Sequence, residues 1–537
     1  MKGGFVESTD ISRKRTVHAV LEQQAEKYGD KTFFHFKDRP YSYNELNNRA
    51  ARVARGLQAV GISKGDKVGI MLDNCPEFLF SWFGVCKAGG VEVPLNTAHK
   101  GDLLEYLLNQ SDCRVLVVDN RYTERLYDIL ANVPGLQAIV VVNGAGKSEG
   151  IDGRTVMDWD ALIANGGDYR PVDIVWSDPF IVMFTSGTTG PSKGALMPHN
   201  YGVYMGEGVC EMTGYTEGDC LYNVLPLFHG NAQLLSTMPA LLSGARMVLA
   251  EKFSASRFWD DIERHGCTEF NYVGGILPIL YKAEPKPADA DNPLRIMMGA
   301  GAPMDLFEAF EKRFGVTLIE GYGMSEIGTP LMNTVKERKP GTCGRPRADY
   351  VVKVVDDDYA EVGPNTPGEL LIRPLKPYCM FLEYYKMPGK TVEACADLWF
   401  HTGDYLYYDE DGYFHFVDRK KDALRRRGEN ISSYEVEKAI NAHPSVSESA
   451  AVAVKSELGE DEVMICLTLK NGKTLQMEDL MAFCEDRMAH FMIPRYVRVM
   501  ERMPKTPTER VKKNVLREEG VTPDTWDREE AGYKLKR

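Results

Sequence analysis

Helix-like and strand-like hydrophobic patterns alternate along the first part of the chain. Residues 16–60 carry helical spacing around a short segment at Tyr41-Ser42-Tyr43, and residues 67–72 form an apolar run typical of a buried strand. The following patterns predict a helix at 74–87, a strand at 90–95, a helix at 103–110 and a strand at 113–119. Such alternation favours parallel sheets with crossover helices.

The pattern changes further along the chain. Residues 144–169 are rich in glycine and aspartate and are expected to form a surface excursion. After residue 345, shorter strands are predicted at 350–355 and 368–373, which suits a more antiparallel subdomain. A charged segment at 418–430 then precedes a final stretch with its own α/β pattern. We therefore predict an α/β fold with a large N-terminal domain of parallel-type sheets flanked by helices, a β-rich subdomain, and a small C-terminal α+β domain.

Composition narrows the class of protein. With 537 residues, 44% hydrophobic and 26% charged, the chain suits a folded protein of more than one domain. The net charge of −13 argues against a general nucleic-acid backbone binder. The eleven cysteines show no paired spacing, the first residues are polar and charged, and no apolar run approaches the roughly 20 residues of a membrane span. We expect a cytoplasmic protein without a transmembrane segment.

The segment 183–194, Met-Phe-Thr-Ser-Gly-Thr-Thr-Gly-Pro-Ser-Lys-Gly, carries the clearest chemistry. Its glycines let backbone N–H groups face one point, its hydroxyls add donors, and its lysine adds a positive charge, as a polyphosphate requires. The segment lacks the Gly-Lys-Ser/Thr ending of a Walker A loop, so an ordinary P-loop NTPase is disfavoured. The alternative is a plain glycine loop between two strands. The predicted phosphate-binding residues are Thr185, Ser186, Gly187, Thr188, Thr189, Gly190 and Lys193.

Several separated motifs share an order and spacing with one superfamily. They lie at 74–78, 87–90, 94–96, 226–229, 299–303, 320–326, 402–404 and 418–419. Together with 185–194, they make the chain resemble the adenylate-forming superfamily of acyl-CoA synthetases, peptide-synthetase adenylation domains and luciferases, over roughly residues 16–517. Within it the chain is most similar to the carnitine/crotonobetaine and medium-chain acyl-CoA ligase branch.

The resemblance implies an ATP site. Tyr322, between two glycines, is expected to stack on adenine, and Glu326 to hold Mg²⁺, a hard cation that prefers oxygen ligands. Asp404 and Arg419 are expected to contact the ribose or phosphate. A core tyrosine, a surface glutamate and turn residues are the alternatives for these positions. The remaining expected ATP contacts are Gly301, Ala302, Pro303, Glu320, Gly321, Gly323, Met324 and Ser325.

The resemblance also implies sites for the acyl group and for coenzyme A. His229 is expected beside the acyl group, the alternative being a packed loop histidine, and the other acyl contacts are Asn231, Val273, Gly274, Gly299 and Gly323. A small mobile C-terminal domain, 423–537, is expected to rotate about a hinge at 418–422, centred on Lys421, relative to an AMP-binding and acyl-binding domain at 1–417. That rotation would bring Arg425, Arg427 and Gly428 to CoA, where arginines suit phosphates. A solvated charge run is the alternative.

One position departs from the superfamily pattern. The expected Pro-Lys-Thr-x-x-Gly-Lys appears as Pro504-Lys-Thr-Pro-Thr-Glu-Arg510, so an arginine stands where a catalytic lysine is expected. Arginine can bridge a carboxylate and an α-phosphate with its planar fork, although it does not replace lysine freely. We predict that Arg510 takes the role, with Lys512 or Lys513 as the alternative if the register slips. The predicted catalytic set is Arg510, Lys513, Glu326, Thr185 and Lys193.

These motifs predict an acid:CoA ligase that uses ATP, Mg²⁺ and coenzyme A and serves fatty acid or lipid metabolism. ATP and a carboxylic acid would give an acyl adenylate and pyrophosphate, and the CoA thiol would then release acyl-CoA and AMP. Two alternatives stay open: a stand-alone adenylation enzyme that loads a carrier-protein thiol, and a nucleotide-binding protein without ligase activity. A homodimer is a further expectation, whereas no nucleic-acid partner is expected.

Overall fold

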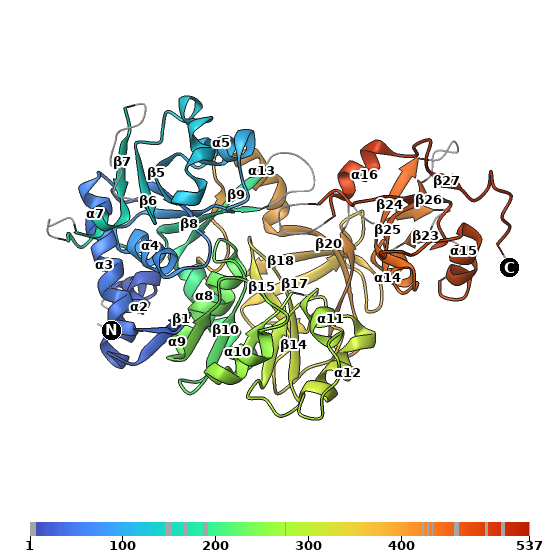
Figure 1. The fold of residues 1–537 in the computed structure, drawn as a ribbon, viewed down its shortest axis with the longest axis horizontal. Helices are drawn as coiled ribbons and strands as arrows, with labels where there is room; N and C mark the ends of the chain where they lie inside the picture. Colours follow the sequence, from blue (N-terminus) through green and yellow to red (C-terminus); the bar gives the residue numbers. More distant parts are fainter. Residues whose placement is uncertain are drawn as a thin grey trace. The chain divides into compact units, whose positions relative to one another are not determined.

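The computed structural model describes residues 7–144, 153–164, 169–185, 192–273, 275–419, 424–426, 429–431, 433–455, 461–488, 492–505 and 511–535 (Figure 1). The chain divides into two units. The larger comprises Met1–Thr185, Ser192–Val352 and Ile372–Phe400, and the smaller includes Lys353–Leu371 and His401–Arg537. The predicted domain limits and hinge stay predictions.

An eight-stranded sheet of the larger unit has the order β19-β9-β8-β4-β3-β5-β6-β7. The strands from β8 to β7 in this order pair in parallel, and β8, β9 and β19 pair antiparallel. Apolar runs such as Cys113–Asp119 are buried on both faces, as parallel strands require. The bounds are β3 Lys67–Met71, β4 Val91–Pro94, β5 Cys113–Asp119, β6 Ala138–Val142, β7 Thr155–Asp158, β8 Pro179–Thr185, β9 Lys193–Pro198 and β19 Glu383–Tyr384.

A nine-stranded sheet of the same unit has the order β16-β15-β14-β13-β12-β10-β11-β1-β2. Its strands from β14 to β1 pair in parallel, and the outer pairs are antiparallel. The bounds are β1 Thr32–Phe36, β2 Arg39–Ser42, β10 Cys220–Asn223, β11 Arg246–Leu249, β12 Glu269–Asn271, β13 Ile296–Gly299, β14 Thr317–Met324, β15 Gly328–Met332 and β16 Arg345–Pro346.

Helices connect these strands, and local signals set their ends. The Ser42 side chain caps one helix by accepting from the Glu45 amide at 3.0 Å, and Gly214 ends another in the left-handed conformation. The helices are α1 Glu7–Lys14, α2 Val17–Tyr28, α3 Tyr43–Ala59, α4 Pro76–Lys87, α5 Gly101–Gln110, α6 Glu124–Tyr127, α7 Trp159–Ala164, α8 His199–Thr213, α9 Met238–Ser243, α10 Phe258–His265, α11 Ile276–Tyr281, α12 Met304–Phe314 and α13 Pro388–Ala394. Short turns are η1 Asn120–Tyr122, η2 Leu130–Asn132, the π-helix η3 Asn231–Thr237 and η4 Ala396–Leu398.

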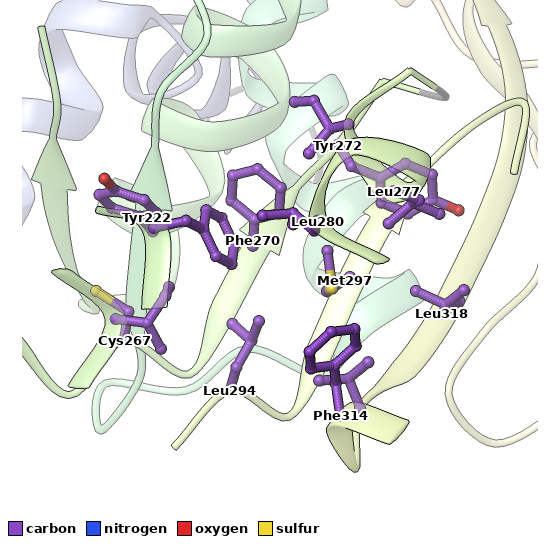
Figure 2. Packing of buried hydrophobic residues seen from close by; sticks show 14 of the residues in the cluster. Tyr222, Cys267, Phe270, Tyr272, Leu277, Leu280, Leu294, Met297, Phe314 and Leu318 are labelled. Atoms are coloured by element: carbon purple, nitrogen blue, oxygen red, sulfur yellow. The ribbon is translucent and has the colours of Figure 1, made fainter. Parts of the chain in front are cut away.

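The nine-stranded sheet packs against helices through one apolar cluster. Figure 2 shows part of it, with Phe270 and Met297 from the strands beside Leu280 and Phe314 from α11 and α12. These side chains are almost completely buried. Burial of a side chain of this size contributes on the order of 1.5–3 kcal/mol. The cluster therefore holds the strands firmly, and with them the loops that leave their carboxyl ends.

The smaller unit contains shorter, largely antiparallel sheets. Their orders are β17-β18-β20-β21, β22-β23 and β24-β25-β26-β27. A separate apolar core, including Val436, Ile465 and Leu480, lies under the last sheet. The bounds are β17 Tyr350–Val355, β18 Gly368–Pro374, β20 Phe400–Tyr408, β21 Phe414–Arg419, β22 Leu424–Arg426, β23 Glu429–Ile431, α14 Ser433–Asn441, β24 Val446–Lys455, β25 Asp461–Leu469, α15 Met477–Glu485, β26 Tyr496–Val499, α16 Lys513–Glu519 and β27 Trp526–Asp527.

The predicted fold class is confirmed, with two local corrections. Residues 16–60 contain the hairpin β1–β2 between two helices, because alternation over so few residues is weaker than the flanking helical pattern. The predicted surface excursion at 144–169 contains β7 and α7, whose Leu162 is fully buried against α3 at Gly56. Of the helices described, none has the length and apolarity needed to cross a bilayer.

Candidate active site

The two ends of the predicted phosphate loop lie side by side. Thr185 ends β8 and is the register partner of Lys193, which begins β9. The Thr185 hydroxyl donates to the Lys193 carbonyl at 3.3 Å. The predicted residues between them, Ser186, Gly187, Thr188, Thr189 and Gly190, lie outside the described residues.

Tyr384 brings two of the predicted catalytic residues together. Its hydroxyl donates to Oε1 of Glu326 at 2.8 Å, and the Lys193 ammonium lies 3.9 Å from its ring centroid. Burial, and then the Glu326 charge, raises the pKa of Tyr384, so the phenol stays protonated and donates. The Glu326 carboxylate is itself buried. Tyr384 could not be singled out from the sequence, because it stands 58 positions from Glu326.

The predicted adenine motif lies along β14 and the start of α12. Glu320 Oε1 accepts from the Ala302 amide at 2.8 Å, which joins the two halves of the motif. Burial raises the pKa of Glu320. Gly323 permits a close backbone approach, because a Cβ there would stand 2.3 Å from the Gly328 carbonyl oxygen. Tyr322 is 7% exposed, so its ring lies mostly within the protein.

Hydrogen bonds and backbone conformation also fix the remaining residues of the predicted adenine motif. The Ser325 carbonyl accepts from the Tyr201 hydroxyl at 2.8 Å, which fixes the turn before Glu326. Gly301 takes a φ of 78°, a left-handed conformation that suits glycine. Pro303 precedes α12, and Gly321, together with Met324, belongs to β14.

The predicted acyl residues follow the carboxyl ends of neighbouring parallel strands. His229 and Asn231 come after β10, Val273 after β12, and Gly299 ends β13. Because these strands are parallel neighbours, their carboxyl ends meet at one edge of the sheet, where ligands bind in such sheets. Asn231 Oδ1 is buried and accepts no hydrogen bond within the described part of the chain. Gly274 lies outside the described residues.

The predicted ribose residues are cross-strand neighbours in the smaller unit. Asp404 on β20 is the register partner of Arg419 on β21, although they stand 15 positions apart. The Asp404 amide donates to the Thr402 hydroxyl at 3.1 Å, and its side chain is buried. Two motifs that were separate in the sequence therefore occupy one place on this sheet.

The other predicted residues of the smaller unit are only partly described. Arg425 pairs with Asn430 between β22 and β23, whereas Lys421, Arg427, Gly428 and Arg510 lie outside the described residues. Lys513 begins α16, and its ammonium donates to Ser433 Oγ at 2.5 Å and pairs with Glu437 at 2.7 Å. In this arrangement Lys513 links α16 to α14.

Known families and proteins resemble this chain over almost its whole length. The AMP-binding enzyme family matches residues 21–385, and the AMP-binding enzyme C-terminal domain matches residues 435–510. The chain belongs to the AMP-binding enzyme family. A crotonobetaine/carnitine–CoA ligase of Salmonella choleraesuis (strain SC-B67) is 32% identical over 520 residues, which cover 94% of this chain and 100% of the relative.

Solved structures agree with this assignment. The anthranilate CoA ligase AuaEII in complex with anthranoyl-AMP has a TM-score of 0.83 and 25% identity, covering 94% of this chain and 96% of its own. ATP-bound MatB from Rhodopseudomonas palustris has a TM-score of 0.81 and 26% identity, covering 93% and 98%. The predicted class is confirmed: this member of the family is an adenylate-forming acid:CoA ligase that uses ATP and CoA.

Proposed function

We propose that Thr185, Lys193, Glu326 and Tyr384 form the phosphate side of the adenylating site, and that the carboxyl ends of β10, β12 and β13 form its acyl side. A bound carboxylate would attack the α-phosphorus of ATP, with pyrophosphate as the leaving group. Most of the catalysis would come from positioning and from preorganised charge. The link from Lys193 through Tyr384 to Glu326 carries this proposal, because it gathers a cation from β9, a donor from β19 and a carboxylate from the turn between β14 and β15.

The residues present fit Mg²⁺ at Glu326. The Tyr384 hydroxyl donates to one carboxylate oxygen, and no described group donates to the other. Among the described residues, no group of three or more acidic, cysteine or histidine side chains is placed to hold a metal ion, so the protein would supply few ligands. Mg²⁺ suits such a place, because it keeps several waters and completes its shell with phosphate oxygens. When bound there, Mg²⁺ would neutralise phosphate charge.

The second half-reaction is proposed to use the smaller unit. Asp404 and Arg419, adjacent on β20 and β21, would hold the nucleotide, and Arg425, Arg427 and Gly428 would receive CoA. The domain at 423–537 would rotate about a hinge at Lys421 relative to the domain at 1–417. The rotation would place different residues beside the adenylate in the two steps. Each step needs a different nucleophile, which supports such an exchange.

For the acid, we propose a short chain that carries a quaternary ammonium group. The 32% identity to the crotonobetaine/carnitine–CoA ligase supports this class. The aromatic pair Phe228–His229, with ring centroids 4.9 Å apart, belongs to the loop predicted to face the acyl group. Aromatic faces attract such cations.

The test is AMP release with ATP, Mg²⁺ and CoA across matched acids. Each trimethylammonium acid is paired with the uncharged acid in which a tert-butyl group replaces the cation. We expect acid-dependent AMP and acyl-CoA, with higher kcat/KM for the cationic member of each pair. AMP release that no acid stimulates would overturn the adenylating site. A preference for uncharged acids would overturn the substrate class alone.

A homodimer and a cytoplasmic location stay predictions. Light scattering of the purified chain measures the first, and fractionation of cells measures the second. Neither outcome affects the chemistry proposed above.

A further inference from the structure

Hydrogen bonds from buried polar side chains stabilise the π-helix η3, Asn231–Thr237. Some of these side chains belong to η3 and one belongs to β12. Gln233 Nε2 donates to the Leu227 carbonyl at 2.8 Å, and Asn271 Nδ2 donates to the Leu235 carbonyl at 2.5 Å. Thr237 Oγ1 donates to the Ala232 carbonyl at 2.8 Å, within the turn itself. π-helices are rare and occur frequently at functional sites. This one directly follows His229 and includes Asn231, so its conformation sets where both lie.

Gln233 also reaches a carboxyl group in the middle of the other sheet. Its Nε2 donates to Glu92 Oε1 at 3.0 Å, and Glu92 lies on β4 with its side chain fully buried. Glu92 Oε2 and Gln233 Oε1 are both buried, and neither accepts a hydrogen bond from any described residue. Two buried acceptors without a donor are costly, by about 1–3 kcal/mol each.

A proton on Glu92 would give both unpaired acceptors a hydrogen-bond role. A protonated Glu92 has an O–H that can donate to Gln233 Oε1, while its other oxygen keeps the bond from Nε2. Burial raises the pKa of Glu92 well above its usual range, which is consistent with a neutral acid. The Cys86 thiol on α4 is sensitive to a charge on Glu92, and burial also raises the pKa of that thiol. For Glu92 itself, burial outweighs the opposing effect of the hydrogen bond from Gln233 on the pKa.

We propose that Glu92 is a neutral carboxylic acid that forms a two-hydrogen-bond ring with the Gln233 amide, and that this ring positions the loop carrying His229 and Asn231 for the acyl group. The part concerning the acyl group rests on the proposed function. Gln233 connects Glu92 to the start of the loop, because its amide also donates to the Leu227 carbonyl. The Leu227 amide donates in turn to Asn74 Oδ1 at 2.8 Å, so the start of the loop is fixed from both sides. Glu92 is thus a positioning residue.

The decisive comparison is Glu92→Gln with Glu92→Leu. A glutamine preserves both bonds of the ring, so kcat/KM for the acid should stay within about threefold of wild type. Leucine leaves Gln233 with unpaired groups, so KM for the acid should rise about tenfold, as loss of one buried hydrogen bond predicts, while KM for ATP stays within about twofold. Equal impairment of both variants, or an unchanged acid KM in Glu92→Leu, would overturn the positioning role.

A spectroscopic measurement keeps the protonation testable even if Glu92→Leu does not fold or no acid is turned over. Infrared difference spectra of wild type minus Glu92→Gln at neutral pH should contain the carbonyl band of a protonated carboxylic acid. A difference spectrum that contains carboxylate bands instead would show that Glu92 is ionised and overturn the ring. This readout needs no substrate, so its failure is distinguishable from failure of the proposed function. Glu263→Gln, at an exposed position of α10, is the control and should lose only carboxylate bands.

Discussion

At the scale of single residues, Tyr384 joins the two charged groups of the proposed phosphate site. Its ring lies against Lys193 and its hydroxyl binds Glu326. A phenol in this place orients the carboxylate without adding charge. In the proposed site it would limit where the phosphates bind, and Tyr384→Phe removes the hydroxyl while keeping the ring.

Tyr384→Phe should slow adenylate formation by about 10- to 100-fold. The expected size follows from a hydrogen bond to a charged group, about 1.5–3 kcal/mol. Acid-dependent exchange of labelled pyrophosphate into ATP, measured across Mg²⁺ concentrations, checks it. The Mg²⁺ concentration that gives half-maximal exchange should rise, because Glu326 loses the hydrogen-bond donor that orients it.

Tyr385→Phe is the matched control, because its hydroxyl binds the exposed Asp112 at 3.0 Å instead. It should exchange pyrophosphate at the wild-type rate. Equal exchange rates for Tyr384→Phe and wild type would show that the hydrogen bond from the phenol to Glu326 does not contribute to adenylate formation.

Leu398 is a strained residue on the surface of the larger unit. It has a φ of 63° and is 80% exposed, so its side chain gains little from packing while its backbone takes a left-handed conformation. That conformation costs an L-residue roughly 1–2 kcal/mol. Leu398→Gly should stabilise the unit by about 0.5–1 kcal/mol after the entropy of the unfolded glycine is subtracted. Thermal unfolding should show a raised Tm.

A substitution by glycine inside a helix should have the opposite effect on stability. Val392 is 73% exposed but lies within α13, where glycine destabilises the helix. Val392→Gly should lower the Tm. A Tm that falls in both variants would mean that the Leu398 side chain matters more than its backbone.

At the scale of elements, periodicity predicted long segments well and short ones poorly. The helix predicted at 74–87 and the strand at 113–119 correspond to α4 and β5. The hairpin β1–β2 was not predicted, because its strands are shorter than the windows in which periodicity is clear. The π-helix η3 has no sequence signal of its own, since tertiary hydrogen bonds from Gln233 and Asn271 fix it.

The candidate site was predictable where motifs are local. The ends of the phosphate loop and the adenine motif could be named because each is contiguous in the sequence. Tyr384 could not, since its role arises only when β19 pairs with β9 and brings it beside Glu326. The cross-strand pairing of Asp404 with Arg419 likewise follows from the register of β20 and β21, which the sequence does not state.

Glu269 on β12 should make stability depend on pH. Burial raises the pKa of this side chain to about 9, against the attraction of Arg295 at 2.6 Å. The pKa of an unfolded glutamate is about 4.3, so between these values the folded state holds more protons than the unfolded state. Its contribution to stability therefore falls as pH rises through this window, by at most about 1.4 kcal/mol per unit.

Glu269→Gln removes this titration. The Tm of wild type minus that of the variant should fall steadily from pH 6 to pH 9 in scanning calorimetry. Glu263→Gln, which is exposed on α10, should follow wild type throughout. A difference that stays constant from pH 6 to pH 9 would mean that Arg295 keeps Glu269 ionised in the folded state, because an ionised glutamate does not titrate in this range.

At the scale of the whole molecule, two half-reactions share one adenylate. The larger unit contains Thr185, Lys193 and Glu326 of the predicted catalytic set, and the smaller unit contains Arg510 and Lys513. Variants of the smaller unit should therefore separate the half-reactions, whereas variants of the larger unit should affect adenylation first. Arg510 and Lys513 test this division, because they lie close in sequence and are predicted alternatives for one role.

Arg510→Ala should slow adenylate formation by a factor on the order of 10² or more, as loss of a charge contact to the transition state does. It should spare thioester formation from a supplied acyl adenylate, because that step needs no α-phosphate clamp. Lys513→Met is the counterpart: it breaks the 2.7 Å pair with Glu437 and should lower the Tm while leaving both half-reactions near wild type. Single-turnover assays of each half-reaction measure the split. If Lys513→Met abolishes adenylation while Arg510→Ala leaves it intact, the register has slipped and lysine, not arginine, bridges the carboxylate and the phosphate.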